Sequence, residues 1–170
     1  MNTALSLVSS QPDNVPSPAT TTLAPGAQRI IRQALSILEQ HLRQPGVPFL
    51  SATETRDWLR LKMAGLEREE FMVLFLDNQH QLLACETLFT GTISHTEVYP
   101  REIVKAALRH NAAAVILAHN HPSGTTEPSR ADRLLTSNLQ NTLLLVDVRI
   151  LDHFIIGHRE IVSFAERGWL

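Results

Sequence analysis

An apolar run that ends in two histidines most constrains what this chain can fold into. Residues 113–118 are short, continuous and apolar, which is typical of a buried central strand. His119 and His121 follow at once, and a turn-forming Pro-Ser-Gly comes after them at 122–124. Because side chains alternate along a strand, both imidazoles would point to the same side. The run therefore predicts a strand whose end presents two nitrogen ligands.

A serine and a carboxylate three residues apart come after this turn. Ser129 and Asp132 open an expected helix over 129–141, so Asp132 would lie in its first turn. A strand end, a tight turn and a helix start can bring two nitrogens and one oxygen together, and that is the protein ligand set of a catalytic zinc site. The same Ser-x-x-Asp pattern is also a capping box, which commonly begins a helix without any catalytic part. Both interpretations remain open at this point.

Taken whole, the string resembles the signature of a known domain family. The spacing His119-x-His121, seven residues, Ser129-x-x-Asp132 resembles the JAMM (MPN, or Mov34-type) metalloprotease domain. The letters His-Asn-His-Pro-Ser-Gly at 119–124 and Pro-Ser-x-x-Asp at 128–132 are similar to the RadC-like branch of that superfamily. The resemblance extends from about Phe71 to the C-terminus, and we expect it to include the helical stretch before Phe71. Three flanking segments agree with it: 86–92, 98–103 and 148–157.

The resemblance implies a fold, a metal and an activity. The fold is α/β, a JAMM/MPN-like mixed β-sheet flanked by helices, with cytidine-deaminase-like layering and extra N-terminal helices. The metal is Zn²⁺, held by His119, His121 and Asp132. The activity is hydrolysis of a peptide or isopeptide bond, with Glu86 as the general base and Ser129 as the donor to the oxyanion. The family's best-understood members cleave ubiquitin-like conjugates, whereas nothing in this sequence identifies such a substrate.

Glu86 also stands out without the resemblance. It lies in the otherwise apolar run 83–89, where an unpaired carboxylate would be costly to bury. The alternative is an edge strand on which Glu86 points to solvent. Glu97 and Glu102 are rival bases, although Glu102 falls in the first turn of an expected helix, where the helix dipole already explains an acidic residue.

A second polar pair, Asp152-His153, interrupts a later apolar stretch. It either holds a ligand imidazole in the right tautomer or forms a satisfied buried pair with no part in catalysis. Asn120 is the other polar residue of the histidine motif. It alternates away from the two imidazoles, so we expect it to bond backbone groups rather than a metal.

Charge and composition limit the partners. The 15 Lys and Arg against 17 Asp and Glu give a net charge of −2, so the chain has no excess of cations for non-specific nucleic-acid binding. The single cysteine, Cys85, forms no internal disulfide. No apolar run is long enough to span a membrane, and the N-terminus has no basic leader. We therefore expect a cytoplasmic protein without a membrane partner.

Three segments divide the chain: a disordered tail over 1–25, a helical segment over 26–66 and the RadC-like JAMM/MPN domain over 67–170. The first predicted helix, 27–44, is amphipathic, and its apolar side either packs onto the sheet or forms a homodimer or partner surface. Ser51 or Thr53 would cap a second helix. The later elements are expected as strands at 71–76, 81–89, 96–99, 113–118, 144–157 (one or two strands) and 161–164, with helices at 100–110 and 129–141.

Three functions are compatible with these features. The first is a zinc-dependent peptidase or isopeptidase acting on a protein or peptide substrate. The second is a DNA repair or recombination accessory protein, as the family name RadC suggests, without autonomous protease activity. The third is a non-catalytic scaffold, which the presence of all signature residues disfavours. A metal-dependent nuclease fits less well, because one carboxylate ligand suits a mononuclear hydrolase better than a two-metal phosphodiesterase.

Overall fold

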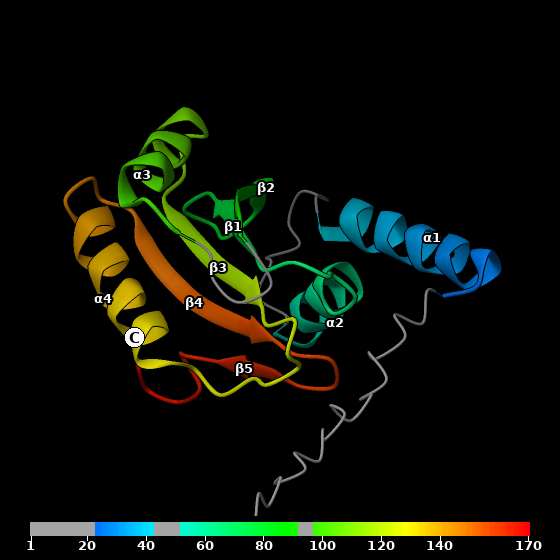
Figure 1. Ribbon diagram of the computed structural model, residues 1–170. Coiled ribbons are helices and arrows are strands. Elements are labelled where there is room, and N and C mark those ends of the chain that lie inside the picture. The colour runs from blue at the N-terminus through cyan, green and yellow to red at the C-terminus, as the bar shows by residue number, and fades with distance from the viewer. Residues whose placement is uncertain (1–22, 43–51, 92–96) are drawn as a thin grey trace, which may run out of the picture.

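The computed structural model describes residues 23–42, 52–91 and 97–170, which form four helices and five strands. The strands form one mixed sheet with helices on both sides (Figure 1). The expected α/β fold, a mixed sheet flanked by helices, is thus confirmed. In chain order the elements are α1 (Pro25–Leu42), α2 (Ala52–Met63), β1 (Glu70–Leu76), β2 (Leu82–Thr90), α3 (Pro100–Arg109), β3 (Ala114–Asn120), α4 (Arg130–Leu144), β4 (Arg149–Ile156) and β5 (Ile161–Ser163).

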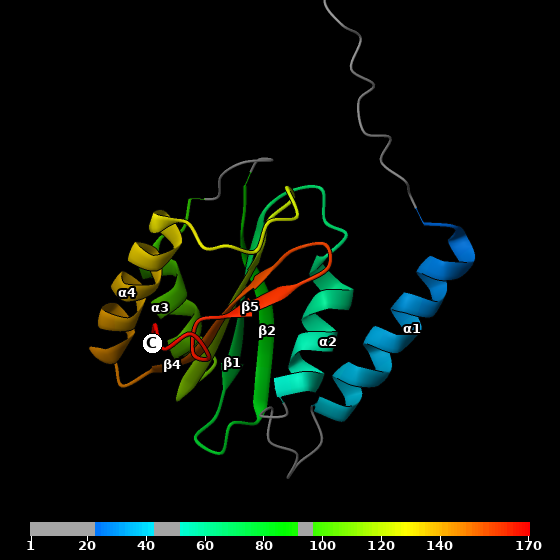
Figure 2. The ribbon, with the colours of Figure 1, turned by 90° about the horizontal axis from the view of Figure 1, so that it is seen from below.

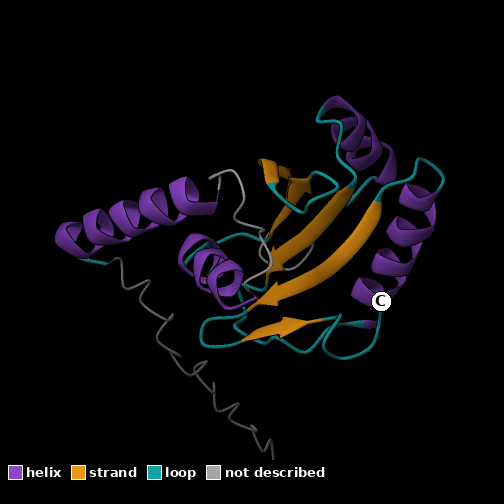
Figure 3. Ribbon diagram, turned by 180° about the vertical axis from the view of Figure 1, so that it is seen from behind, coloured by secondary structure: helices purple, strands orange, loops and turns teal. Residues whose placement is uncertain are grey.

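The sheet has the strand order β2-β1-β3-β4-β5, so β3 is its central strand. β1 pairs antiparallel with β2 and with β3, β3 pairs parallel with β4, and β4 pairs antiparallel with β5. Figure 3 shows β3 and β4 side by side as long strands in the middle of the sheet. Parallel neighbours need a crossover connection, which contains α4. All of β3 is buried, as the apolar run predicts.

Alternation along β1 divides the interior into two cores, one on each face of the sheet. The even-numbered residues of 72–76 belong to the core beneath α1 and α2, whereas the odd-numbered residues of 71–75 belong to the core beneath α3 and α4. Figure 2 shows these two helix pairs on opposite sides of the sheet. Because both faces of β1 are covered, its sequence is continuously apolar instead of alternating with polar residues.

A one-residue bulge in β4 decides which of its side chains face α3 and α4. The pairing of β3 with β4 shifts after Val115, which leaves Leu151 as an extra residue in β4. Beyond the shift, His153 pairs with Leu117 and shares the face that carries His119. Without the extra residue, the period of two would turn His153 to the opposite face of the sheet.

Two expected strands are wrong in part. Residues 97–99 are not a strand; they lead directly into α3, whose first residue is Pro100 as expected. Residues 144–148 are not a strand either, because α4 continues through Leu144 and a turn with Asp147 at a φ of 58° follows. The stretch of 144–157 therefore holds a single strand, β4.

The remaining differences concern helix starts and residues outside the described ranges. Thr53 lies inside α2, which begins at Ala52, so the prediction that Thr53 caps this helix is wrong. Ser51, Thr96 and residues 1–22 lie outside the described residues, and the expectations placed on them are neither confirmed nor contradicted. In the part of the chain that is described, no helix combines the length and the apolar character needed to cross a bilayer.

The apolar side of α1 divides into two parts. Leu35 and Leu38 pack against the core beneath α2, whereas Ile30 and Ile37 are 65% and 59% exposed. The main contact of α1 is therefore with α2, through which it packs onto the core, and not directly with the sheet as expected. A homodimer formed through the exposed part stays a prediction.

Truncation of the β1 side chain that faces α2 tests the core assignment. Leu74 has no exposed surface, so Leu74→Ala should lower the free energy of unfolding by about 2–5 kcal/mol through lost burial and a residual cavity. Leu145 is 85% exposed, so the control Leu145→Ala should stay within about 0.5 kcal/mol of the wild-type protein. Denaturant titration measures both, and equal losses in the two variants would contradict the two-core description.

Candidate metal centre

Three side chains from the end of β3 and the start of α4 meet at one place. His119 is the second-last residue of β3, His121 directly follows the strand, and Asp132 lies in the first turn of α4. Each offers one ligand atom, and the three atoms all lie within 4.8 Å of one another. Figure 2 shows the start of α4 and the loop after β3 at the same end of the molecule. Among the described residues, this is the one group of its kind.

The distances within this group match those between the ligands of a single ion. The Nε2 atoms of His119 and His121 are 3.0 Å apart. Asp132 Oδ1 is 3.4 Å from His119 Nε2, and Asp132 Oδ2 is 3.8 Å from His121 Nε2. Tetrahedral ligands about 2.0–2.1 Å from a zinc ion would lie about 3.3 Å from one another. The residues present therefore fit a metal ion of this size, and the group could bind one.

A backbone carbonyl fixes which nitrogen of His121 faces the group. His121 Nδ1 lies 2.7 Å from the carbonyl oxygen of Thr125. A carbonyl oxygen only accepts hydrogen bonds, so Nδ1 carries the proton and donates it. In the neutral ring, Nε2 then presents a lone pair to His119 and Asp132. This is the protonation that a metal-ligating histidine needs.

Burial of the group is uneven. The His119 side chain is 2% exposed, whereas Asp132 and His121 are 15% and 17% exposed. His119 thus forms the floor of the group, and the other two form its rim. A metal held from below by three side chains would keep its fourth position toward solvent, which is the arrangement of catalytic rather than structural zinc sites.

Ser129 and Asp132 form the predicted capping box, and the box also positions the carboxylate. Oδ2 of Asp132 accepts hydrogen bonds from the backbone N–H of Ser129 at 2.7 Å and from its hydroxyl at 2.6 Å. The Asp132 N–H in turn donates to Ser129 Oγ at 3.1 Å. These bonds occupy Oδ2 and leave Oδ1 facing His119. The capping box is therefore confirmed, and it does not compete with metal binding, because it leaves Oδ1 of Asp132 beside His119.

The environment of Asp132 keeps its carboxylate ionised. Burial by itself would raise its pKa, but the interaction with His119 and the hydrogen bonds from Ser129 outweigh that effect and hold the pKa of Asp132 well below its ordinary value. A carboxylate must be deprotonated to bind a metal. Asp132 meets that condition at neutral pH.

The structure does not bring Glu86 to the three ligands. Its carboxylate accepts hydrogen bonds from Arg109 and interacts with His110, each at 2.6 Å, at the end of α3. The end of α3 leads into the start of β3, whereas His119 lies at the other end of that strand. Burial would raise the pKa of Glu86, but the bonds from His110 and Arg109 lower it overall. The apolar run around Glu86 therefore has a structural explanation, an ion pair with α3.

The rival carboxylates do not approach the ligands either. Glu102 is paired with Lys105 at 2.9 Å on the surface of α3. Glu97 is exposed and interacts with Tyr99.

Glu69 is the acidic residue that sequence reasoning missed. It comes two residues before Phe71, which pairs with His119 across β1 and β3. The Asn120 side chain fixes this stretch, since it accepts from the Glu70 N–H at 2.8 Å and donates to the Arg68 carbonyl at 2.9 Å. Asn120 thus bonds backbone groups, as expected. If the pairing continued by two residues, Glu69 would stand opposite His121. That position depends on the register between two strands, which no local pattern reveals.

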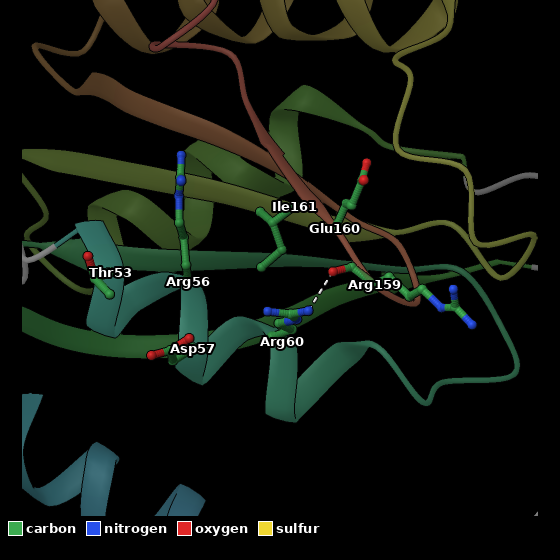
Figure 4. A pocket seen from close by; sticks show the side chains of 7 residues that line it. All are labelled: Thr53, Arg56, Asp57, Arg60, Arg159, Glu160 and Ile161. Carbon is green, nitrogen blue, oxygen red and sulfur yellow. Dashed lines mark hydrogen bonds between the residues drawn. The ribbon is translucent and has the colours of Figure 1, made fainter.

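A hollow elsewhere on the surface does not bring together a comparable group of metal-binding side chains. It holds about 360 Å³ between α2 and the turn after β4. In Figure 4 the side chains of Arg56, Asp57 and Arg159 point in different directions, and Arg60 donates to the Arg159 carbonyl at 2.5 Å. The hollow therefore offers no gathered ligand set.

The fold and the site together define a three-layer α/β protein with a His-His-Asp group that could bind a metal. A family model described as the RadC-like JAB domain matches residues 49–169. The chain therefore belongs to the RadC-like JAB domain family, a branch of the JAB/MPN superfamily, and the resemblance seen in the sequence is confirmed.

Curated relatives are similar over most of the chain. The UPF0758 protein YfjY of Escherichia coli K12 is 61% identical over 153 residues, which cover 90% of this chain and 96% of that protein. The UPF0758 protein YkfG of the same strain is 62% identical over 148 residues, 87% of this chain and 94% of its own length. A UPF0758 protein of Dechloromonas aromatica is 63% identical over 123 residues, 72% of this chain and 54% of its own. These names state no activity.

The ion pair of Glu86 predicts how stability depends on pH. Because the folded pKa of Glu86 is lowered, its stabilising contribution is present above the unfolded value of about 4.3 and is lost as the pH falls through the folded pKa. Glu86→Gln should therefore destabilise the protein at pH 7 by about 0.2–1 kcal/mol, and the difference from wild type should shrink below about pH 4. Thermal unfolding measured from pH 3 to pH 7 checks this; a difference that does not change with pH would contradict the ion pair.

Proposed function

We propose that this protein is a zinc-dependent hydrolase that cleaves a peptide or isopeptide bond in a protein or peptide substrate. The observation that carries the proposal is the convergence of His119, His121 and Asp132, with one side of the group open to solvent. Membership of the JAB/MPN superfamily, in which hydrolases are common, supports it. No observation favours a role in DNA repair over this one.

The ligand set supports zinc and a single ion. Two imidazole nitrogens and one carboxylate oxygen are ligands that zinc prefers, whereas calcium and magnesium prefer oxygen alone. Bound here, zinc would lower the pKa of water toward neutrality and polarise a carbonyl oxygen. Among the described residues no second group of ligands lies beside the first. This arrangement supports amide hydrolysis in preference to two-metal phosphodiester chemistry.

We further propose Glu69, not Glu86, as the general base. Amide hydrolysis needs a group that takes the proton of the attacking water and returns it to the leaving amine. The carboxylate of Glu86 is engaged by Arg109 and His110, so it is not placed to do this. Glu69 is fixed by the backbone on both sides of it and comes two residues before the register partner of His119.

Ser129 has a different part in this proposal from the oxyanion donor that the resemblance implies. Its hydroxyl proton is directed to Asp132 Oδ2 at 2.6 Å. To reach a substrate oxygen, the hydroxyl would have to leave that bond and weaken the cap of α4. We therefore propose that Ser129 mainly holds Asp132 in its ligating position.

A hollow along the loop that follows β3 is our candidate for the substrate site. It holds about 380 Å³ and is lined by residues 123–125 and 158–160. Thr125, whose carbonyl accepts from His121, is part of this lining. We propose that the chain being cleaved lies here, where it would reach the open side of the ligand group.

The matched pair Glu69→Gln and Glu86→Gln tests the proposal. Zinc-loaded protein is assayed on a quenched fluorescent peptide library and on branched peptides joined through a lysine side chain. Glu69→Gln should keep its zinc and lose about 10²–10⁴-fold in kcat/KM, since a missing base removes that much. Glu86→Gln should keep both zinc and activity, because its partners, Arg109 and His110, lie at the end of α3 and not among the proposed ligands.

The opposite pattern would contradict the assignment. Activity lost in Glu86→Gln and kept in Glu69→Gln would restore Glu86 as the base. Loss of zinc in Glu69→Gln would make Glu69 a ligand instead. Activity of the wild-type protein that survives complete removal of metal by a chelator would contradict the zinc-dependent mechanism as a whole.

A further inference from the structure

His153 is a buried polar residue directly behind His119. It has no exposed surface, and its ring nitrogens face an imidazole and a hydroxyl, not a carboxylate, so a charged ring here would be a buried charge without a counter-ion. Its Nε2 lies 2.9 Å from His119 Nδ1, and its Nδ1 lies 2.7 Å from Thr136 Oγ1. A neutral imidazole has one N–H and one lone pair. One of the two contacts of His153 must therefore use its N–H as a donor, and the other must use its lone pair as an acceptor.

The hydroxyl of Thr136 determines which contact is which. Thr136 Oγ1 lies 2.7 Å from the backbone carbonyl oxygen of Asp132 and donates its single proton there. It can then only accept from His153, so His153 Nδ1 carries the proton. His153 Nε2 is left as an acceptor, and His119 Nδ1 donates to it. The remaining nitrogen of His119, Nε2, presents its lone pair to His121 and Asp132.

We propose that His153 and Thr136 are positioning residues whose hydrogen bonds hold His119 in the tautomer that binds metal. The inference rests on the proposed metal site and deepens it. These hydrogen bonds form a relay that runs from the Asp132 carbonyl through Thr136 and His153 to the ring of His119. Both of its ends are thus proposed ligand residues. It therefore ties α4, β4 and β3 together behind the ligands, and it makes the helix that supplies the carboxylate also set the protonation of the imidazole.

If these hydrogen bonds ran in the reverse direction, His119 could not bind a metal through Nε2. If Thr136 donated to His153 Nδ1, His153 Nε2 would carry the proton and donate to His119 Nδ1. His119 would then carry its own proton on Nε2, the atom that faces His121 at 3.0 Å. A protonated Nε2 has no lone pair for a metal. Because the Asp132 carbonyl accepts the Thr136 proton, His119 keeps its own proton on Nδ1 and leaves Nε2 free to bind a metal.

The packing around His153 holds its ring in place. The rings of Phe71 and Phe164 lie 5.6 and 4.8 Å from it, centroid to centroid. Its backbone N–H donates to Asp152 Oδ1 at 2.7 Å, and the same carboxylate accepts from the Ser163 hydroxyl at 2.6 Å. Of the Asp152-His153 pair, Asp152 fixes the strand, while His153 contacts the ligand.

Removal of one hydroxyl from α4 tests the relay. Thr136→Val keeps the shape of the side chain but takes away the acceptor of His153 Nδ1–H. Zinc affinity, measured by competition with a chromogenic chelator, should fall about 10–100-fold, whereas Thr136→Ser should stay near wild type. Thr142→Val is the matched control, because Thr142 also donates to a carbonyl four residues earlier, that of Asn138 at 2.7 Å, on the same helix. It should leave zinc affinity unchanged.

A second measurement needs no substitution. Nitrogen-15 NMR of the histidine rings reports which nitrogen of His153 carries the proton, in metal-free and in zinc-loaded protein. The relay predicts Nδ1–H for His153 in both, and loss of this tautomer in Thr136→Val. Nε2–H on His153 in the wild-type protein, or equal zinc affinity in Thr136→Val and Thr142→Val, would overturn the inference. A wild-type protein that binds no zinc yet carries Nδ1–H on His153 would overturn the proposed function and leave the relay standing.

Discussion

The hydrogen bonding of β3 on both sides is the constraint on which the site depends. β1 pairs with it along one edge and β4 along the other, and every residue of the strand is buried. A strand held in this way has no freedom to slide or rotate, because a slip of one residue would turn all its side chains over. The His119 side chain, near its end, is therefore rigidly placed, and the loop and helix that follow bring His121 and Asp132 to it.

The start of α4 serves stability and chemistry with the same atoms. The cap at Ser129 satisfies backbone groups that would otherwise lack partners at a helix start. In doing so it occupies one oxygen of Asp132 and directs the other toward His119. Four residues later, Thr136 bonds back to the Asp132 carbonyl and joins the relay through His153. A substitution at this helix start would therefore change helix stability and ligand geometry together.

Local spacing explains what the sequence could predict, and sheet register explains what it could not. The grouping of His119, His121 and Asp132 could be predicted from the sequence, because a strand end and a capping box are patterns of residues close together in the chain. Glu86 stands out in the sequence as a carboxylate in apolar surroundings, but its partners are Arg109 and His110 at the end of α3, not the three candidate ligands. The relation of Glu69 to His119 follows from the pairing of β1 with β3, and that of His153 from the extra residue in β4. Neither pairing leaves a signal in a single sequence.

The most direct test of the account is a cobalt titration of the metal-free protein followed by visible absorption. Cobalt(II) replaces zinc in sites of this kind and reports their geometry, because tetrahedral ions absorb far more strongly than octahedral ones. The account predicts intense bands that saturate at about one ion per chain and disappear in His121→Ala and in Asp132→Ala. A titration in which no ion binds, or a spectrum that survives both substitutions, would show that these side chains do not share one ion.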